Sequence, residues 1–321
     1  MLPRDNNPRR ILMSNTPKIS RRTALASAAA LPLAAVTART GYAAPPITGA
    51  QMSPFQRLKV GGFDVTTLLA GTVPRDDPHS IFGLNVDKET FDSVSAAANL
   101  PTDKAQFFFT PTVVNTGSEL VLFDTGLSGV GTVAALEAAG YTADLIDVVV
   151  LTHMHGDHIG GMTLEDGSPT FANARYVTGR IEYDAWAAQD NDRFKSKVVP
   201  FAEKMTFLED GGTVASGLTA MGAFGHTPGH MNYMIESEGT QLYLGADFAN
   251  HYIWSLGHPD WEVKFDMDKP AAAAMRRKIL DMLAADKVAF VGYHMPWPGV
   301  GYVETRDSGF TYVPHSYQLM L

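Results

Sequence analysis

Three histidines and an aspartate lie within six positions of one another, and they are the strongest indication of chemistry in the sequence. The segment 151–161 reads LTHMHGDHIGG and contains His153, His155, Asp157 and His158. Imidazole nitrogens and carboxylate oxygens are ligands for divalent zinc, manganese or iron. A polar surface loop accounts for this cluster poorly, because the chain has only 10 histidines and three of them lie here. The segment therefore predicts a metal site.

The residues before this segment indicate how its side chains converge. The apolar, β-branched run at 147–152 (DVVVLT) predicts a buried strand. Residues two apart at the end of a strand point to the same side, so His153 and His155 can bind one ion. A turn at the following glycine then directs Asp157 and His158 toward a second point a few Å away.

Three further segments place candidate ligands where strands give way to loops. These segments are GHTPGH at 225–230, LYLGADF at 242–248 and VAFVGYH at 288–294, and their candidates are His226, His230, Asp247 and His294. Catalytic groups are commonly held on loops that a rigid scaffold positions. The four strand ends together predict one composite site.

With these motifs the sequence resembles the metallo-β-lactamase superfamily over nearly all of the chain after residue 50. The HxHxDH signature is intact at 153–158, and the later family ligands match His226, Asp247 and His294. An earlier family element, a strand ending in Asp-x-Gly, matches 120–126 (LVLFDTG). The resemblance implies an α+β fold, a four-layer αββα sandwich with two metals in a cleft at one edge of its two sheets.

The resemblance also implies a role for each ligand. One metal would be bound by His153, His155 and His226, the other by Asp157, His158 and His294, and Asp247 would bridge the two. Asp124 would not bind a metal itself but would contact one of the ligands and orient it. His230 is placed behind the ligands too, with a loop histidine bonded to a backbone carbonyl as the alternative.

The chemistry expected of such a site is hydrolysis. Two divalent ions, zinc or else manganese or iron, would hold a bridging hydroxide at neutral pH and polarise the bond under attack. Asp157 and Asp247 are the candidate catalytic carboxylates, and Asp157 would also carry a proton to the leaving group. The chain has no cysteine and no GxSxG motif, so thiol catalysis is excluded and no serine nucleophile is indicated. The expected enzyme is a metal-dependent hydrolase of phosphotriester, aryl ester or lactone bonds.

The ligand set is shared by only some subfamilies, and these subfamilies act on different substrates. Glyoxalase II-type thioesterases, acyl-homoserine lactonases and methyl parathion hydrolases share it, and the resemblance to the last group extends to 63–71 and 301–314. One lactonase group has a tyrosine three residues after the bridging aspartate, where this chain has Asn250, with Tyr252 two residues further. Trp186 falls where aromatics line the leaving-group pocket of the resembling hydrolases. A member without catalysis, which binds a ligand or partner, is the non-enzymatic alternative.

Residues 1–43 read as an export signal that is removed. The run SRRTAL at 20–25 resembles a twin-arginine signal, an alanine-rich stretch follows, and the small residues Gly41 and Ala43 suit a signal peptidase. The apolar stretch is shorter than the roughly 20 residues that span a bilayer, so no membrane anchor is expected. The expectation is a periplasmic or secreted protein with one domain at 44–321. A general secretory signal is the alternative.

The charge of the remaining chain restricts its partners. The chain has 25 Lys+Arg and 34 Asp+Glu, of which residues 1–43 hold seven and one, so residues 44–321 carry a net charge of −15. Such a surface disfavours nucleic acid and anionic membranes. A small neutral ester or lactone is the expected substrate, and a homodimer is compatible with the sequence.

Periodicity predicts four local elements. They are a hairpin at 58–69 turning at Gly61-Gly62, a helix at 130–139 ended by Gly140, a strand then a helix at 174–189, and a helix at 270–285. The last helix is expected to have Arg276, Arg277 and Lys278 on its surface and Ile279, Met282 and Leu283 inward.

Overall fold

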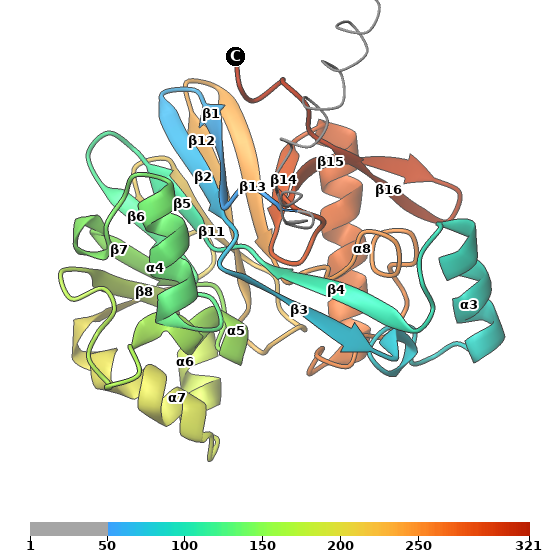
Figure 1. The fold of residues 1–321 in the computed structure, drawn as a ribbon, viewed down its shortest axis with the longest axis horizontal. Helices are drawn as coiled ribbons and strands as arrows, with labels where there is room; N and C mark the ends of the chain where they lie inside the picture. Colours follow the sequence, from blue (N-terminus) through green and yellow to red (C-terminus); the bar gives the residue numbers. More distant parts are fainter. Residues whose placement is uncertain (1–50) are drawn as a thin grey trace, which may run out of the picture. The chain divides into compact units, whose positions relative to one another are not determined.

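Two seven-stranded sheets face each other in the computed structural model, which describes residues 51–321 (Figure 1). The first sheet has the order β1-β2-β5-β6-β7-β8-β9 and the second the order β10 to β16. The expected export signal at 1–43 lies outside the described residues. None of the helices within 51–321 is long and apolar enough to cross a membrane.

The first sheet begins with the expected hairpin, because Gly61 takes a φ of +56° at the turn. Its strands are β1 (Phe55–Val60), β2 (Phe63–Leu68), β5 (Thr112–Asn115), β6 (Leu120–Phe123), β7 (Val148–Leu151), β8 (Arg175–Gly179) and β9 (Met205–Leu208). From β6 to β9 neighbouring strands are parallel. Parallel strands need long crossovers, and the helix α4 (Gly129–Ala138) supplies the one between β6 and β7.

The second sheet is antiparallel except where β13 pairs with β14 in parallel. Its strands are β10 (Thr213–Ala215), β11 (Leu218–Gly222), β12 (Met231–Ser237), β13 (Thr240–Ala246), β14 (Ala289–Gly292), β15 (Val300–Arg306) and β16 (Gly309–Pro314). The crossover between β13 and β14 contains the long helix α8 (Lys269–Asp286). Both crossovers end at strands that carry predicted ligands.

The core lies between the two sheets and under the helices outside them. Apolar side chains of both sheets, such as Val65, Val150 and Leu244, are fully or almost fully buried in one cluster. Burial of each such side chain contributes about 1.5–3 kcal/mol. Helices α4, α5 (Gly156–Ile159), α6 (Arg180–Ala187) and α7 (Asp192–Lys197) lie along the first sheet, and α8 lies against the second (Figure 1). The predicted four-layer αββα sandwich is confirmed.

A two-stranded ribbon stands apart from both sheets. It consists of β3 (Gly71–Asp76) and β4 (Lys104–Phe109), with the helix α3 (Lys88–Ala97) between them in sequence. Phe91 and Trp254 are buried in an aromatic cluster beneath this insertion. Four short 3-10 helices complete the elements: Pro78–Ser80, Ala143–Leu145, Gly160–Met162 and Val199–Lys204. The ribbon runs across one end of the sandwich in Figure 1.

The other local elements are confirmed, with one error inside α8. Helix α4 is followed by Gly140 at φ +85°, and β8 leads directly into α6. Arg276, expected on the surface, is instead completely buried. Its guanidinium donates to Oδ2 of Asp266 at 2.7 Å and to the carbonyl oxygens of Phe248 and Pro259 at 3.1 and 2.7 Å. Periodicity predicts arginine on the surface, because a buried arginine is tolerated only when its charge and its N–H groups have partners. Arg276 has such partners here.

Candidate metal centre

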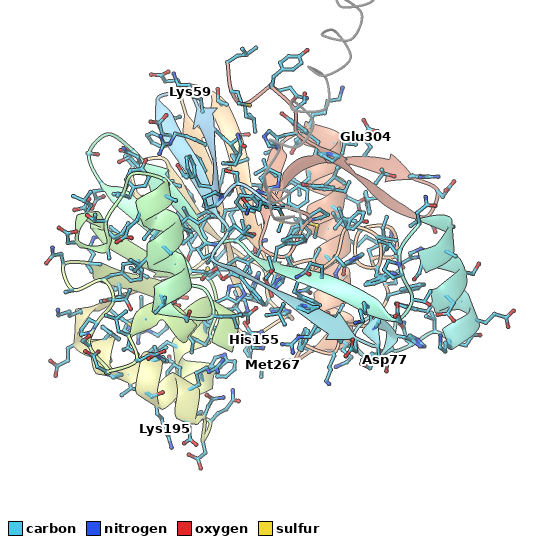
Figure 2. The ribbon with its side chains drawn as sticks, in the orientation of Figure 1. Lys59, Asp77, His155, Lys195, Met267 and Glu304 are labelled. Atoms are coloured by element: carbon cyan, nitrogen blue, oxygen red, sulfur yellow. The ribbon has the colours of Figure 1, made fainter. Side chains whose placement is uncertain are left out.

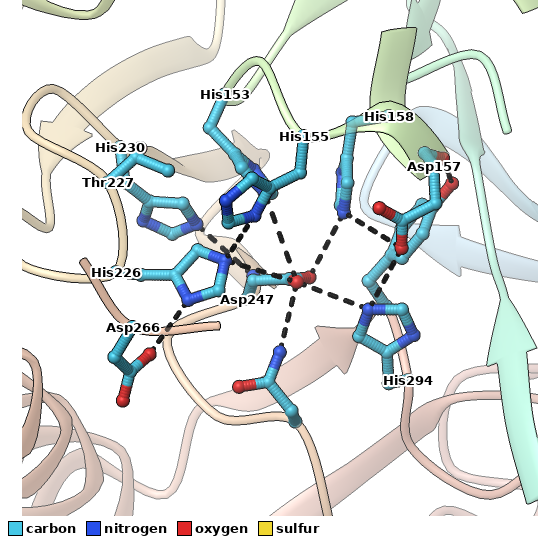
Figure 3. Close-up of polar contacts among 12 residues, drawn as sticks. His153, His155, Asp157, His158, His226, Thr227, His230, Asp247, Asp266 and His294 are labelled. Atoms are coloured by element: carbon cyan, nitrogen blue, oxygen red, sulfur yellow. Dashed lines mark hydrogen bonds and ion pairs between the residues drawn. The ribbon is translucent and has the colours of Figure 1, made fainter. Parts of the chain in front are cut away.

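Seven predicted ligands meet where strands of the two sheets end (Figure 3). His153 and His155 follow β7, Asp157 and His158 lie in α5, His226 precedes β12, Asp247 follows β13, and His294 follows β14. All seven side chains are buried except those of His155 and Asp157, which are partly exposed. The structure brings the whole predicted set together.

The first group contains three imidazole nitrogens at close range. Nδ1 of His155 lies 3.1 Å from Nε2 of His153 and 3.0 Å from Nε2 of His226. Ligands about 2.0–2.1 Å from a tetrahedral ion are separated from one another by roughly 3.3 Å. The spacing of the three nitrogens therefore fits a shared cation.

The second group has the same character and shares Asp247 with the first. Oδ2 of Asp157 lies 3.4 Å from Nε2 of His294 and 3.8 Å from Nε2 of His158. The carboxylate of Asp247 places Oδ1 at 3.3 Å from His158 Nε2 and Oδ2 at 3.4 Å from His226 Nε2. Figure 3 shows Asp247 at the centre of these contacts. Its two oxygens thus face both groups.

Two buried atoms of this cluster have no hydrogen-bond partner among residues 51–321. They are Nε2 of His158 and Oδ1 of Asp247. Leaving a buried polar atom unpaired costs about 1–3 kcal/mol, and a divalent cation between these two atoms would satisfy both. The residues present therefore fit a pair of divalent ions.

Charge within the cluster also suits cation binding. Burial lowers the pKa of His153 well below its usual value and that of His155 to about 3, so both rings are neutral. Burial lowers the pKa of His226 too, but its hydrogen bonds with the carboxylates of Asp247 and Asp266 outweigh this and raise it to about 9. Burial raises the pKa of Asp247, but the adjacent His294 and His158 hold it well below its usual value. Neutral imidazoles and an ionised carboxylate are what a divalent cation requires, and its binding would displace the protons of the imidazoles whose pKa is raised.

Asp124 lies behind His158 and fixes the orientation of its ring. Its Oδ2 is 2.8 Å from His158 Nδ1, and it accepts from the backbone N–H and the hydroxyl of Thr152 at 2.9 and 2.8 Å. The residue has a φ of +61°, a conformation uncommon outside glycine. Asp124 therefore leaves Nε2 of His158 as the nitrogen that faces the cluster.

His226 is oriented in the same way by a residue that the sequence did not indicate. Oδ1 of the buried Asp266 lies 2.8 Å from Nδ1 of His226, and its Oδ2 accepts from Arg276. Asp266 lies two residues before the capping Asp268 of α8, and nothing in its sequence context separates it from a loop acid. Asp266 and Arg276 form one buried ion pair behind His226. This pair explains both why the surface prediction for Arg276 is wrong and why Asp266 was not predicted.

Glu182 is a second residue that sequence reasoning missed. Its buried carboxylate accepts from the backbone N–H of Met154 at 2.9 Å, and from the hydroxyl of Thr227 and the N–H of Gly229 at 2.7 and 2.9 Å. These donors belong to the HxH loop and the HTPGH loop. An acid in the first turn of a helix usually complements the helix dipole, so no signal in the sequence separates Glu182 from that ordinary role.

Two further residues, His230 and Asn250, also contact Asp247. His230 donates from Nδ1 to the carbonyl oxygen of Ala223 at 3.1 Å, and its Nε2 accepts from the backbone N–H of Asp247 at 3.2 Å. His230 therefore bonds to a backbone carbonyl oxygen, as the loop alternative predicts, and it also lies behind the predicted ligand Asp247. Asn250 donates to Oδ2 of Asp247 at 3.0 Å. Tyr252 is not among the residues that line the metal cleft.

The cluster lies at the floor of a cleft of about 260 Å³. Its lining consists of four predicted ligands, three phenylalanines, two arginines, a leucine and a glycine: Arg75, Phe107, Phe109, Leu127, His155, Gly156, Asp157, Arg193, Asp247, Phe265 and His294. Trp186, the expected pocket residue, is not in this lining. It is buried with its ring edge-on to His155, at a centroid distance of 5.8 Å. The aromatic walls come from the β3–β4 ribbon and from the loop before α8.

Comparison with known proteins agrees with this site. The family model described as the metallo-beta-lactamase superfamily matches residues 110–294, which include every ligand named above. An N-acyl homoserine lactonase of Bacillus cereus is 28% identical over 112 residues, which are 35% of this chain and 42% of that protein. The uncharacterized protein YobT of Bacillus subtilis is 28% identical over 162 residues, 46% of this chain and 68% of that protein. The chain spans less than half the length of the curated lactonases that it matches.

Solved structures give a broader overlap. AidC, a dizinc quorum-quenching lactonase in complex with a product, superimposes with a TM-score of 0.76 at 26% identity over 83% of this chain and 99% of that one. The hydrolase AbOPH of the beta lactamase superfamily gives 0.77 at 22% identity over 84% and 100%, a likeness of fold. The expected likeness to lactonases is confirmed, and these relatives agree with the expectation of a metal-dependent hydrolase. Because the superfamily model covers more than half of the chain and all seven ligands, the chain belongs to the metallo-β-lactamase superfamily.

Proposed function

We propose that this protein is a dinuclear metal-dependent hydrolase that opens lactones or cleaves related esters. The observation that carries the proposal is the convergence of seven ligands in two groups that share Asp247, at the floor of a cleft. The similarity to a dizinc lactonase over most of the chain supports both the reaction class and zinc as the metal. Manganese and iron are the alternatives that the mixed ligand set allows.

Bound divalent ions would supply a water of lowered pKa and polarise the carbonyl oxygen of the ester. The residues of this chain would do the rest. The Asp157 side chain lines the cleft, so its carboxylate can accept a proton from the attacking water and return it to the leaving oxygen. Tyr293 donates to the carbonyl oxygen of Asp157 at 2.6 Å and thereby fixes this loop. The side-chain amide of Asn250 donates to Asp247 and holds its carboxylate in place.

The walls of the cleft suit an apolar acyl or aryl group. Phe107, Phe109 and Phe265 line it, and apolar walls with a few polar groups are typical of small-molecule sites. The tyrosine that assists one lactonase group has no counterpart here, because Asn250 points at Asp247 and Tyr252 lies outside the cleft. An aryl ester, a phosphotriester and a thioester therefore belong beside a lactone in any test.

The cellular location is a separate proposal that rests on the sequence. We infer export by the twin-arginine pathway to the periplasm or the medium, with residues 44–321 as one mature domain. Replacing Arg21 and Arg22 by lysine should retain the precursor in the cytoplasm, which fractionation and immunoblotting would show. Unchanged export of that variant would favour a general secretory signal.

The deciding experiment measures metal content together with turnover of an acyl-homoserine lactone, an aryl ester, a phosphotriester and a thioester. About two metals per chain and a clear preference for one substrate are expected. Asp247→Asn should lower turnover by more than about 100-fold, beyond the loss typical of an outer partner, and should reduce metal content. Asp281→Asn, an exposed acid on α8, is the matched control and should change neither. A wild-type protein that holds two metals yet cleaves none of the four would contradict the proposal.

A further inference from the structure

Two arginines line the metal cleft from different parts of the chain. Arg75 belongs to β3 of the ribbon, and Arg193 belongs to α7 beside the first sheet. Both side chains are exposed. Neither is a metal ligand, and the hydrolytic chemistry described above uses neither.

These two guanidinium groups differ from every other one in residues 51–321. The six remaining arginines each contact a carboxylate or carbonyl oxygen: Arg57 with Ala139, Arg175 with Glu119, Arg180 with Asp184, Arg276 with Asp266, Arg277 with Asp260 and Arg306 with Asp307. Within the same range, no ion pair or side-chain hydrogen bond involves the guanidinium of Arg75 or Arg193. The unpaired arginines of this part of the chain are thus the two at the cleft.

The lack of a side chain at Gly156 leaves room for the guanidinium of Arg193 close to the loop of candidate ligands. A Cβ at Gly156 would collide with Nη1 of Arg193. The guanidinium therefore lies against the backbone between two ligands, His155 and Asp157. Only glycine allows this approach.

With divalent ions bound, the charge in the cleft would be opposite to that of the chain. The lining carboxylates are Asp157 and Asp247, and both face the metal groups, so bound divalent ions would more than offset them. Arg75 and Arg193 then leave the cleft positive within a domain whose net charge is −15. A local field of this kind concentrates and steers anions. The net charge of the chain predicts a neutral substrate, whereas the local charge of the cleft favours an anionic one.

We propose that Arg75 and Arg193 form an anion-binding subsite, and that the preferred substrate is an ester or lactone carrying a carboxylate away from the scissile bond. The inference rests on the proposed hydrolase function. Guanidinium groups bind carboxylates with two parallel hydrogen bonds. The phenylalanine walls take the apolar body between the carboxylate and the ester.

Two matched pairs of esters test the subsite. Mono-4-nitrophenyl glutarate carries the carboxylate on the acyl side, and 4-carboxyphenyl butanoate carries it on the leaving group. The partner of each has a carboxamide in place of the carboxylate. In at least one pair the wild-type kcat/KM should favour the carboxylate by about tenfold, the scale of one charge-assisted hydrogen bond. The ratio should fall as salt screens the exposed charges.

Variants locate the effect. Arg75→Gln and Arg193→Gln should each lower the ratio, mainly through KM, and the double variant should bring it near one. Lys195→Gln, also on α7 but outside the cleft lining, removes the same charge and should leave the ratio unchanged. Figure 2 shows Lys195, which belongs to α7, well apart from His155.

Equal turnover of both members in both wild-type pairs, or an undiminished preference in the double variant, would overturn the subsite. If the metal-loaded protein cleaves no ester, the hydrolase proposal fails separately. The uncleaved esters then act as ligands in isothermal titration calorimetry. Tighter binding of the carboxylate that the double variant loses would support the subsite, and equal binding would overturn it.

Discussion

At the scale of single residues, the candidate metal centre depends on which nitrogen of each imidazole would face the ions. His153, His158, His226 and His294 present Nε2, because Nδ1 is bonded to Thr152, Asp124, Asp266 and the carbonyl oxygen of Phe108. His155 presents Nδ1 instead, and Trp186 lies against its ring. The outer partners therefore determine the donor set as much as the histidines do.

Asp266→Ala should affect stability and metal binding by separable routes. The change leaves the buried charge of Arg276 unpaired, which costs about 3–5 kcal/mol of unfolding free energy, and it frees the ring of His226, which should weaken zinc binding by about 10–100-fold. Urea unfolding and zinc competition titrations measure the two effects.

Adding Arg276→Met to that variant is the control. The double variant should recover much of the stability, because no buried charge remains unpaired, yet zinc binding should stay weak. An Asp266→Ala protein as stable as the wild type would contradict the pairing.

At this scale the sequence predicts the candidate ligands but few of the residues that orient them. The ligands were predictable because a surface loop seldom gathers three histidines and an aspartate in six positions, and because each later candidate follows an apolar run. Asp266 and Glu182 were not, because a carboxylate is recognised as buried only when its tertiary partners are known. Arg276 was misplaced for the same reason.

At the scale of elements, α6 connects the two loops that carry His155 and His226. Its Glu182 accepts hydrogen bonds from both loops, and a Cβ at Gly229 would collide with the backbone N of Glu182. Burial raises the pKa of Glu182, although the donated hydrogen bonds act against this. The first turn of α6 is therefore packed directly on the HTPGH loop.

Glu182→Gln should loosen this connection. The amide keeps the shape but places an N–H group against donors on one side, which leaves a buried polar group unsatisfied at a cost of about 1–3 kcal/mol. Thermal unfolding and zinc retention during dialysis should both decline. Glu203→Gln, an exposed acid nearby in sequence, should behave as wild type. Full zinc retention by Glu182→Gln would show that the loops hold their positions without this carboxylate.

The elements that the sequence predicts are confirmed, and the ribbon is among those that it does not predict. The hairpin at β1–β2, the helices α4 and α8 and the β8–α6 unit follow apolar periodicity and glycine positions. The ribbon β3–β4 was not identified, because half of its side chains face solvent and its packing against Trp254 and Phe82 is long-range. Yet this ribbon supplies Arg75 and two phenylalanines to the cleft.

At the scale of the molecule, the metal centre joins the two sheets. The HxHxDH ligands come from the first sheet, and His226, Asp247 and His294 come from the second. Ions bound to the folded state alone stabilise it by mass action. The sandwich was predictable from the resemblance, whereas the position of residues 1–43 lies outside the described part of the chain.

Removing the metals should therefore lower the stability of the whole sandwich. Free zinc at 1,000 times its Kd should add about 4 kcal/mol of unfolding free energy per site. Differential scanning calorimetry before and after chelation, with metal content measured, tests this expectation. An unchanged Tm after proven metal loss would mean that the two sheets stay packed together without stabilisation by bound metal.

The spacing of the ligands along the chain also sets an order for biosynthesis. The ligands run from His153 to His294, and the shared Asp247 comes from the strand before α8. A nascent chain that has produced only the first sheet holds four of the seven donors and no bridge between them. The complete pair of candidate sites arises only after β14 has been synthesised and docked, so we expect stable metal loading only at the end of folding.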